Sequence, residues 1–382
     1  MTKPKIAVLI DWYLPGTKAG GPVRSVFSLI NLMQPFFDFY VITTNSDLGS
    51  TVPYQDVNAN SLFQKNGVNY YYFSREQLNQ DSLVNVINNI QPNLIYLNSF
   101  WSAHFSVNIV RLKYKKVIQA PVLLAPRGML GKGALGIKPI KKQIFLLLSK
   151  FFTWHKSVSF HATQEQEVKD ILNYFPKAKI LVAPNVNSSG VCTNKSSKNI
   201  NTLSLFFLSR ISRVKNLHYA LHVLKTIPST LTVTYDIYGN IEDKDYWQEC
   251  EEIISALPIN IKVSYKGELA FDKVSDSIKN YNALLMPTLN ENYGHSIVES
   301  LLCGCLPIIS NQTPWNDLED AGYSLDLNQP EDFAAAINEL AGLSETDFKQ
   351  RSQNAINYIT KKINLSTITQ QYNSIFNASI KN

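Results

Sequence analysis

Long hydrophobic runs are missing from this chain of 382 residues, and so are the simple signatures of a membrane or secreted protein. No uninterrupted apolar run reaches the roughly 18 residues that a membrane-spanning helix requires. The apolar stretch near the N-terminus, Lys5 to Asp11 (KIAVLID), is shorter than the hydrophobic region of a secretory signal and is typical of a buried strand. We therefore expect a cytoplasmic protein.

Cysteine is scarce, and the four that occur are Cys192, Cys250, Cys303 and Cys305. Their spacing matches neither a metal site nor a disulfide framework. Cys303 and Cys305 flank a glycine where we expect a helix to end, so we predict packing of small residues there. The sequence accordingly predicts no metal site and no cofactor.

Acidic residues are absent from Ser82 to Gln164, a stretch that holds 11 Lys and Arg residues. The other 25 basic residues and all 30 acidic ones lie elsewhere, so the basic stretch accounts for the net charge of +6. Such a surface favours an anionic partner: a membrane, a nucleic acid or a phosphorylated substrate. We expect no nucleic acid, because no recognisable binding motif accompanies the basic residues.

Residues 137–156 (IKPIKKQIFLLLSKFFTWHK) combine five lysines of this stretch with Phe, Leu and Trp. An amphipathic helix of this composition lies on a membrane surface, which predicts peripheral contact with the inner face of a cytoplasmic membrane. The alternative is that the apolar residues pack against a sheet while the lysines face water.

Strand patterns alternate with helical patterns along both halves of the chain, which predicts two doubly wound parallel sheets. Hydrophobic residues make up 45% and charged residues 17%, and this length suits two globular domains. The expected strands are 5–11, 39–43, 93–98, 122–126, 157–161, 203–209, 233–238, 261–266, 282–287 and 306–310, and the expected helices include 21–36, 215–226 and 246–256. A polar linker at 186–201 then separates domains at 1–185 and 202–365.

Two carboxylates eight residues apart, Glu291 and Glu299, lie in the run MPTLNENYGHSIVESLLCGCLPIIS (286–310). We interpret this run as the end of a strand, a polar loop with Glu291, an amphipathic helix with Glu299, and a second strand. Both acids then face the carboxyl edge of a parallel sheet, where open α/β folds bind ligands. A carboxylate accepts two hydroxyl donors at once and a helix N-terminus favours phosphate, so the unit suits a ligand that carries both groups.

This run resembles the Glu-x7-Glu motif of retaining, nucleotide-sugar-dependent glycosyltransferases of family 4. That family has the GT-B fold, in which two Rossmann-like domains flank an inter-domain cleft. The resemblance implies that Glu299 holds the ribose hydroxyls of the donor and that Glu291 meets hydroxyls of the donor sugar. It also implies that the amides around Tyr293, Gly294 and His295 face sugar and phosphate.

Further runs extend the resemblance over nearly the whole chain. Arg210 and Lys215, in FLSRISRVKN, have the five-residue spacing of the family's diphosphate-binding cations. Two fixed cations stabilise the charge that develops on a departing nucleoside diphosphate without a metal. Residues 19–24 (AGGPVR), with Gly21, resemble the glycine loop between donor and acceptor, and the loop around Lys266 resembles part of the nucleobase pocket.

Arg127, in the run APRGML, departs from the family pattern, because many relatives carry a histidine near the reacting sugar at this strand end. Two roles stay open for Arg127: stabilising the leaving phosphate, or anchoring an anionic acceptor. We expect His104 and His161 to be structural. Thr163 opens the run TQEQ, which we interpret as a capping box.

The resemblance implies a metal-independent retaining glycosyltransferase whose catalytic groups are Arg210, Lys215, Glu291 and Arg127. The run 313–315 (TPW) resembles enzymes of bacterial surface polysaccharides, such as O-antigen, capsule or exopolysaccharide. We therefore expect a glycan or lipid-linked glycan acceptor on the basic first domain, against which a closing helix at 366–382 packs. The alternatives are a nucleotide-sugar epimerase or hydrolase with the GT-B fold, and a non-catalytic partner of another transferase.

Overall fold

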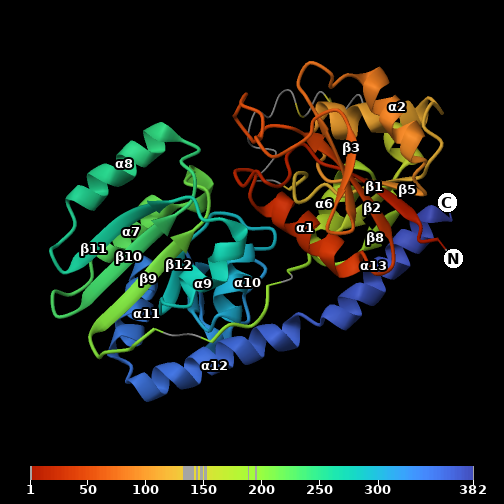
Figure 1. Ribbon diagram of the computed structural model, residues 1–382. Helices are drawn as coiled ribbons and strands as arrows, with labels where there is room; N and C mark the ends of the chain where they lie inside the picture. Colours follow the sequence, from red (N-terminus) through yellow and green to blue (C-terminus); the bar gives the residue numbers. More distant parts are fainter. Residues whose placement is uncertain are drawn as a thin grey trace. The chain divides into compact units, whose positions relative to one another are not determined.

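The structure is a computed structural model that describes residues 2–131, 153–187, 189–193 and 196–381, together with Lys142, Phe145, Leu146 and Ser149. The chain separates into two compact units (Figure 1): unit 1 comprises Met1–Ser188 and Leu365–Asn382, and unit 2 comprises Ser189–Asn364. Most of the predicted membrane-surface segment 137–156 lies outside the described residues. In the part of the chain that is described, no helix is both long and apolar enough to cross a membrane.

Unit 1 contains a sheet with the described order β3-β4-β2-β1-β5-β6-β7-β8, parallel except for the antiparallel pair β3 and β4. Its strands are β1 (Lys5–Leu9), β2 (Asp38–Thr44), β3 (Leu62–Lys65), β4 (Val68–Phe73), β5 (Leu94–Leu97), β6 (Val122–Leu124), β7 (Ser159–Ala162) and β8 (Ile180–Val182). Its described helices are α1 (Gly21–Met33), α2 (Gln80–Ile90), α3 (Asn108–Tyr114), α6 (Glu165–Tyr174) and α13 (Leu365–Ile380), with short turns at Ala103–Val107 and Trp154–Ser157.

The C-terminal helix α13 belongs to the core of unit 1, although it is remote in sequence from the sheet. The ring of Phe376 packs edge to face on Phe37, with centroids 5.4 Å apart, and 5.5 Å from the ring of Tyr96 on β5. The hydroxyl of Tyr372 donates to the carbonyl of Pro184, just after β8, over 3.0 Å. Aromatic burial and a hydrogen bond therefore attach α13 to the first sheet.

Unit 2 contains a parallel sheet with the described order β11-β10-β9-β12-β13-β14. Its strands are β9 (Thr202–Leu208), β10 (Thr232–Tyr238), β11 (Ile261–Gly267), β12 (Ala283–Met286), β13 (Leu306–Ser310) and β14 (Tyr323–Leu325). Its helices are α7 (Leu217–Lys225), α8 (Lys244–Ser255), α9 (Val274–Ile278), α10 (His295–Leu302), α11 (Pro330–Gly342) and α12 (Glu345–Lys362), with short turns at Arg213–Lys215, Phe271–Lys273 and Glu319–Ala321. Helix α8 runs alongside β10 and β11 (Figure 1).

The sequence of unit 2 explains why its central elements are fully covered. Strands β12 (ALLM) and β13 (LPIIS) are buried at every residue, as continuous apolar runs in parallel sheets are. Helix α10 is also buried at every residue, which is typical of a helix inside the core. In both units the strand order reverses once, between β1 and β5 and between β9 and β12, and these reversals are the topological switch points at which such sheets bind ligands.

The prediction of two doubly wound parallel sheets is confirmed, and three local features differ from it. The helix predicted to begin at residue 215 begins at Leu217, because Asn216 adopts a left-handed conformation with φ 59° and ends a short turn. The hairpin of β3 and β4 was missed, although its Asn66-Gly67 turn has φ values of 51° and 78° and Asn-Gly is the strongest hairpin signal. Strand β14 was missed because it has only three residues.

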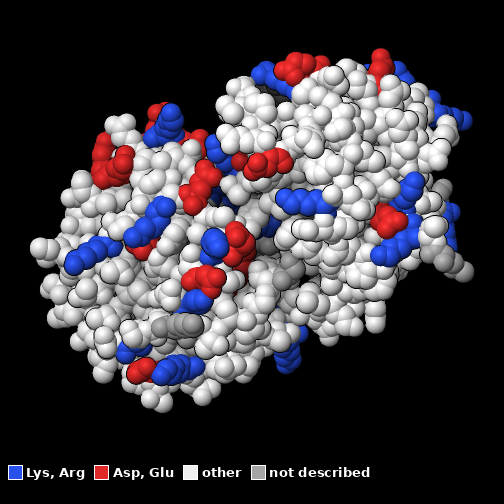
Figure 2. Space-filling view, in the orientation of Figure 1, with Lys and Arg blue, Asp and Glu red and all other residues white. Residues whose placement is uncertain are grey.

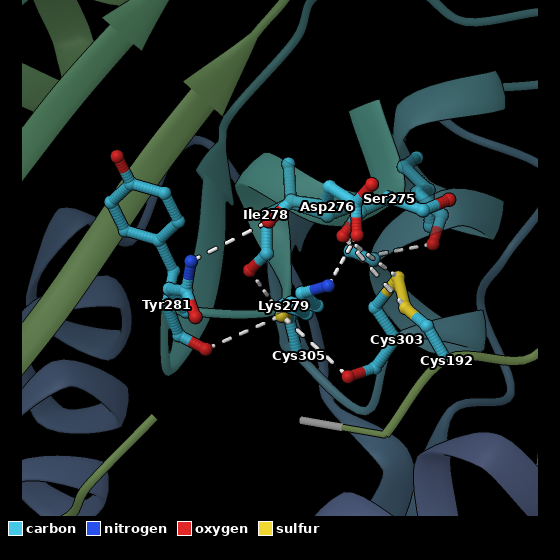
Figure 3. Close-up of a disulfide and its surroundings, with 11 residues drawn as sticks. Cys192, Ser275, Asp276, Ile278, Lys279, Tyr281, Cys303 and Cys305 are labelled. Carbon is cyan, nitrogen blue, oxygen red and sulfur yellow. Dashed lines mark hydrogen bonds and ion pairs between the residues drawn. A yellow bond between two sulfur atoms is a disulfide. The ribbon is translucent and has the colours of Figure 1, made fainter. Parts of the chain in front are cut away.

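The prediction that the cysteines do not pair is wrong. Cys192 and Cys303 form a disulfide across 111 residues of sequence, with Cα atoms 4.6 Å apart (Figure 3). The backbone N–H of Cys192 donates to the carbonyl of Leu302 over 3.0 Å, so this segment lies along the C-terminal end of α10. Cys250 and Cys305 remain thiols, and the Cys305 Sγ donates to the carbonyl of Ile278 over 3.2 Å. Residue spacing did not reveal the pair because tertiary packing creates it.

The disulfide restricts the unfolded chain more than the folded one, which predicts a measurable loss of stability when it is removed. We expect Cys192→Ser to lower the free energy of unfolding of unit 2 by about 2–4 kcal/mol. Urea unfolding with and without a phosphine reductant measures the loss. The reductant should lower the free energy of unfolding of the parent to that of the variant, and it should leave the value of the variant unchanged. Four alkylatable thiols in the unfolded, unreduced parent would contradict the disulfide.

Candidate functional site

The loops after β9 and β12 meet at the switch point of unit 2, because these strands are neighbours in the sheet. The N–H of Leu289 donates to the carbonyl of Val214 over 2.8 Å. The side-chain amide of Asn216 donates to the carbonyl of Pro287, also over 2.8 Å. Two backbone carbonyls therefore fix one loop against the other at the edge where a ligand is expected.

Lys215 and Glu291 form an ion pair across this contact. The ammonium Nζ lies 2.6 Å from the carboxylate Oε2, although the residues are 76 positions apart in the chain. The side chains are only 11% and 18% exposed, so solvent screens the pair less than a surface pair. Oε1 of Glu291 accepts from the N–H of Asn292 over 3.2 Å. An ammonium has three N–H donors, so the pair leaves Lys215 able to bind an anion as well.

Gly294 connects Glu291 to helix α10, and the site requires a glycine there. Its φ is 77°, a left-handed conformation that disfavours other residues. A Cβ on this residue would lie 2.7 Å from Cδ1 of Ile297 and 3.2 Å from Cγ of Glu291. The carbonyl of Gly294 accepts from the N–H groups of Ile297 and Val298, which starts α10 directly behind the ion pair.

Glu299 lies inside α10 and is 5% exposed. The ring of Tyr293 packs 4.8 Å from His295 and 5.9 Å from Trp315, measured between centroids. Burial, and then the charge of Glu299, raise the pKa of Tyr293 well above its ordinary value, so it stays a phenol. Its hydroxyl is buried and has no hydrogen-bond partner among the described residues, which makes it a donor near the Glu299 carboxylate.

Arg210 and Lys266 form separate ion pairs in unit 2. The Arg210 guanidinium lies 2.7 Å from Oε2 of Glu242, and the two side chains are 40% and 42% exposed. The Lys266 ammonium lies 3.4 Å from Oδ2 of Asp236. Arg210 shares its loop with Lys215, whereas Lys266 lies on β11. The predicted roles of these residues in donor binding stay predictions.

Gly21 begins α1 at the switch point of unit 1. Gly20, which precedes it, has φ 64°, and Pro22 occupies the first turn of the helix as its fixed φ allows. The side chain of Asp47 accepts from the N–H of Thr17 over 3.0 Å, which holds the loop before the glycines. The loop after β1 is therefore held in place and ends in two glycines, and its predicted contact with a donor stays a prediction.

Arg127 follows β6 in the same unit, with a left-handed φ of 56°. One NH2 group donates to Oδ1 of Asn98 over 2.7 Å and to the hydroxyl of Tyr96 over 2.9 Å. The other donates to Oδ1 of Asn185. Asn98, Tyr96 and Asn185 thus hold the guanidinium near the carboxyl edge of the sheet. Neither role that we left open for Arg127 is decided by these contacts.

His161 extends this network and is fully buried. Its Nε2 lies 2.8 Å from the carbonyl of Ala183, which only accepts, so Nε2 carries the proton. Nδ1 then accepts from the hydroxyl of Tyr96, also over 2.8 Å. Burial, and then the charge of Arg127, lower the pKa of His161 to about 3. A neutral imidazole with both nitrogens bonded accords with the structural role expected for it.

The capping box predicted over residues 163–166 (TQEQ) is wrong, because the N-cap of α6 is Gln164 and no side chain caps the helix there. Helix α6 begins after Gln164, and the buried carboxylate of Glu167 accepts from both the N–H and the hydroxyl of Thr163 over 2.7 Å. Its other oxygen accepts from the N–H of Gly128 over 2.6 Å. Glu167 therefore ties α6 to the turn that carries Arg127.

Sequence reasoning missed the residues that partner the predicted ones, namely Glu242, Asp236, Tyr96, Asn98, Asn185 and Glu167. A polar side chain directly after a strand is a signal in the sequence that could have identified such a residue. Asn98 has this signal, because it immediately follows β5. The others carry no local signal. Among the residues that the structure describes, no three His, Cys, Asp or Glu side chains form a group able to hold a metal ion.

Comparison with protein families finds a match within unit 2. Residues 193–361 match the family model described as glycosyl transferases group 1. The match covers the sheet of unit 2, including both loops of the Lys215–Glu291 pair. A sequence comparison with curated proteins finds no match.

Comparison with solved structures finds several of similar fold. Anabaena HepE in complex with UDP and glucose has a TM-score of 0.70 at 15% identity, covering 98% of this chain and 100% of HepE. Sucrose-phosphate synthase from Thermosynechococcus elongatus has a TM-score of 0.72 at 13% identity, covering 98% of this chain and 99% of the synthase. A structure described as trehalose-6-phosphate from E. coli bound with UDP-2-fluoro glucose has a TM-score of 0.67 at 9% identity, covering 99% of both chains. These matches show that the chain has the GT-B fold.

The buried neutral state of His161 predicts a pH dependence of unit 1. The unfolded residue titrates near pH 6.5 and the folded one near 3, so the unfolded state binds the extra proton between these values. Stability therefore falls as the pH drops from about 6.5 toward 3, by up to about 1.4 kcal/mol per pH unit. Urea unfolding at pH 7, 6, 5 and 4 measures the slope. His161→Gln should flatten it, the exposed His222→Gln should not, and parallel curves for the parent and His161→Gln would contradict the assignment.

Proposed function

We propose that this chain is a glycosyltransferase that moves a sugar from a nucleotide-sugar donor to an acceptor. The main support for the proposal is that the region matching glycosyl transferases group 1 contains the switch-point loops that hold Lys215 against Glu291. Structures of the same fold that contain UDP with glucose, or UDP-2-fluoro glucose, support a nucleotide-sugar as the donor.

Each group at the switch point has a role in this reaction. When the bond between the sugar and the diphosphate breaks, its electron pair passes to a phosphate oxygen, which gains negative charge. Lys215 and Arg210 stabilise that charge, as fixed cations do in a partly dry site. The carboxylate of Glu299 binds the ribose hydroxyls, and Glu291 orients the donor sugar. No step requires a metal ion.

The finer features of the proposal rest on the resemblance. The reaction retains the anomeric configuration, by front-face attack in which the departing phosphate helps to remove the acceptor proton. The acceptor is a glycan or lipid-linked glycan of a bacterial surface polysaccharide, bound by unit 1 near Gly21 and Arg127. NMR of the product separates retention from inversion, and an inverted product would exclude this mechanism.

Donor binding is tested first by a thermal-shift screen with UDP-, GDP- and ADP-sugars. A ligand that binds only the native state raises its apparent stability by RT ln(1 + [L]/Kd). One nucleotide class should therefore raise the melting temperature in a concentration-dependent way. No shift with any donor, together with no binding by calorimetry, would remove the proposal.

The Glu299→Ala variant tests the site itself. We expect its affinity for the donor identified by the screen to fall at least about tenfold, since buried polar contacts to hydroxyl groups are lost. Glu251→Ala, an exposed glutamate on α8, is the matched control and should bind as the parent does. Equal affinities for both variants would place the donor elsewhere.

Turnover separates the proposal from its alternatives. An epimerase or hydrolase converts the donor rapidly without an acceptor, whereas a transferase does so slowly and accelerates when acceptor glycan is added. A non-catalytic partner binds the donor without turnover. Chromatography of the donor, with and without acceptor, distinguishes the three.

A further inference from the structure

The cations around the proposed diphosphate site are each paired with a carboxylate. Lys215 pairs with Glu291, and Arg210 pairs with Glu242 on the loop between β10 and α8. Nearby, Arg213 contacts both Glu249 and Asp243. In Figure 2 blue and red side chains lie next to one another over unit 2, at the left of the view. An anionic ligand that enters this region therefore meets cations whose charge is already partly neutralised.

The backbone fixes the Arg210–Glu242 pair, unlike a chance contact of two surface side chains. A β-bridge joins Ile211 to Ile241. The N–H of Ile211 donates to the carbonyl of Asn240 over 2.9 Å, and the N–H of Glu242 donates back to the carbonyl of Ile211 over 3.2 Å. Arg210 and Glu242 thus each lie one residue from the bridge, and the backbone sets the distance between these two residues.

Gly239 allows the two loops to approach this closely. A Cβ on Gly239 would lie 1.8 Å from the carbonyl oxygen of Ser209, the residue before Arg210. Its φ of 145° is also one that other residues rarely adopt. The loop that carries Glu242 is therefore built to lie directly against the loop that carries Arg210.

We propose that Glu242 is a built-in counter-charge to Arg210 that limits how tightly the site holds a nucleoside diphosphate. This inference rests on the proposed function and adds an affinity-determining residue to it. Glu291 also neutralises a cation, but it contacts the donor sugar in the proposed reaction. Glu242 has no such role, and its carboxylate repels the diphosphate that Arg210 attracts.

The distances set the size of the effect. A diphosphate bound by Arg210 would lie a few ångströms beyond the guanidinium, and at that separation from the Glu242 carboxylate we expect diphosphate binding to be weakened about threefold to tenfold at low salt. The guanidinium has five N–H donors, and the contact to Glu242 uses NH1 alone. Arg210 can therefore bind the carboxylate and a phosphate oxygen together, and Glu242 acts by charge without blocking the cation.

Glu242→Gln tests the inference, because glutamine keeps an oxygen that accepts from Arg210 and removes the charge. Calorimetric titration with UDP, GDP and ADP measures Kd, and the nucleotide that binds the parent most tightly is used for all variants. We expect a Kd about three to ten times lower for Glu242→Gln at 50 mM NaCl, with the ratio approaching one at 500 mM as salt screens the charge. Glu249→Gln is the matched control: it removes an equal charge beside Arg213 and should change Kd less than twofold.

The outcomes separate the inference from the proposed function. If the parent and Glu249→Gln bind a nucleotide and Arg210→Gln weakens it, the donor site stands. If the Kd of Glu242→Gln is then equal to or higher than that of the parent, the counter-charge is overturned. It is also overturned if the tighter binding of Glu242→Gln persists unchanged at 500 mM NaCl. If the parent binds none of the three nucleotides, the proposed function fails and the counter-charge fails with it.

Discussion

The ion pair between Lys215 and Glu291 is the interaction on which the arrangement of the candidate site depends. Its partners are 76 residues apart, and they meet because β9 and β12 are neighbours at the point where the strand order reverses. Both side chains are largely buried, so neither charge is tolerated well without the other. The pair therefore fixes the loop after β9 relative to the start of α10. Because Glu299 lies inside that helix, the same contact also sets its position.

Much of this arrangement is readable from the sequence, because each part of it has a local pattern. The run 286–310 gives strand, loop, helix and strand in the order that the structure shows, since apolar runs and a glycine mark every boundary. The proximity of Lys215 to Glu291 follows only when the parallel-sheet topology is added. Glu242 was not predicted, because a glutamate in a short polar loop has no periodicity or spacing that separates it from solvent-facing acids.

The features that escaped prediction depend on side-chain direction and on tertiary proximity. The direction of the Arg127 guanidinium, toward Asn98, Tyr96 and Asn185 within unit 1, was not predicted, and its predicted contact with substrate stays a prediction. A left-handed backbone at Arg127 sets that direction, and no sequence pattern announces such a conformation for an arginine. The Cys192–Cys303 disulfide escaped for the same reason, because only the folded chain brings its ends together.

Charge compensation explains how a site with several cations forms before any anion arrives. Unpaired cations at one sheet edge would repel one another and oppose folding, whereas carboxylates from neighbouring loops remove that cost. The compensation also affects binding. A ligand phosphate is attracted by the cation and repelled by the carboxylate already paired with it, so its net electrostatic gain is smaller than the cation alone would give. A pair that is mostly buried, such as Lys215–Glu291, keeps its geometry, and in the proposed reaction it orients the donor. An exposed pair, such as Arg210–Glu242, contributes little to stability, so its charge is left to act on whatever anion enters the site.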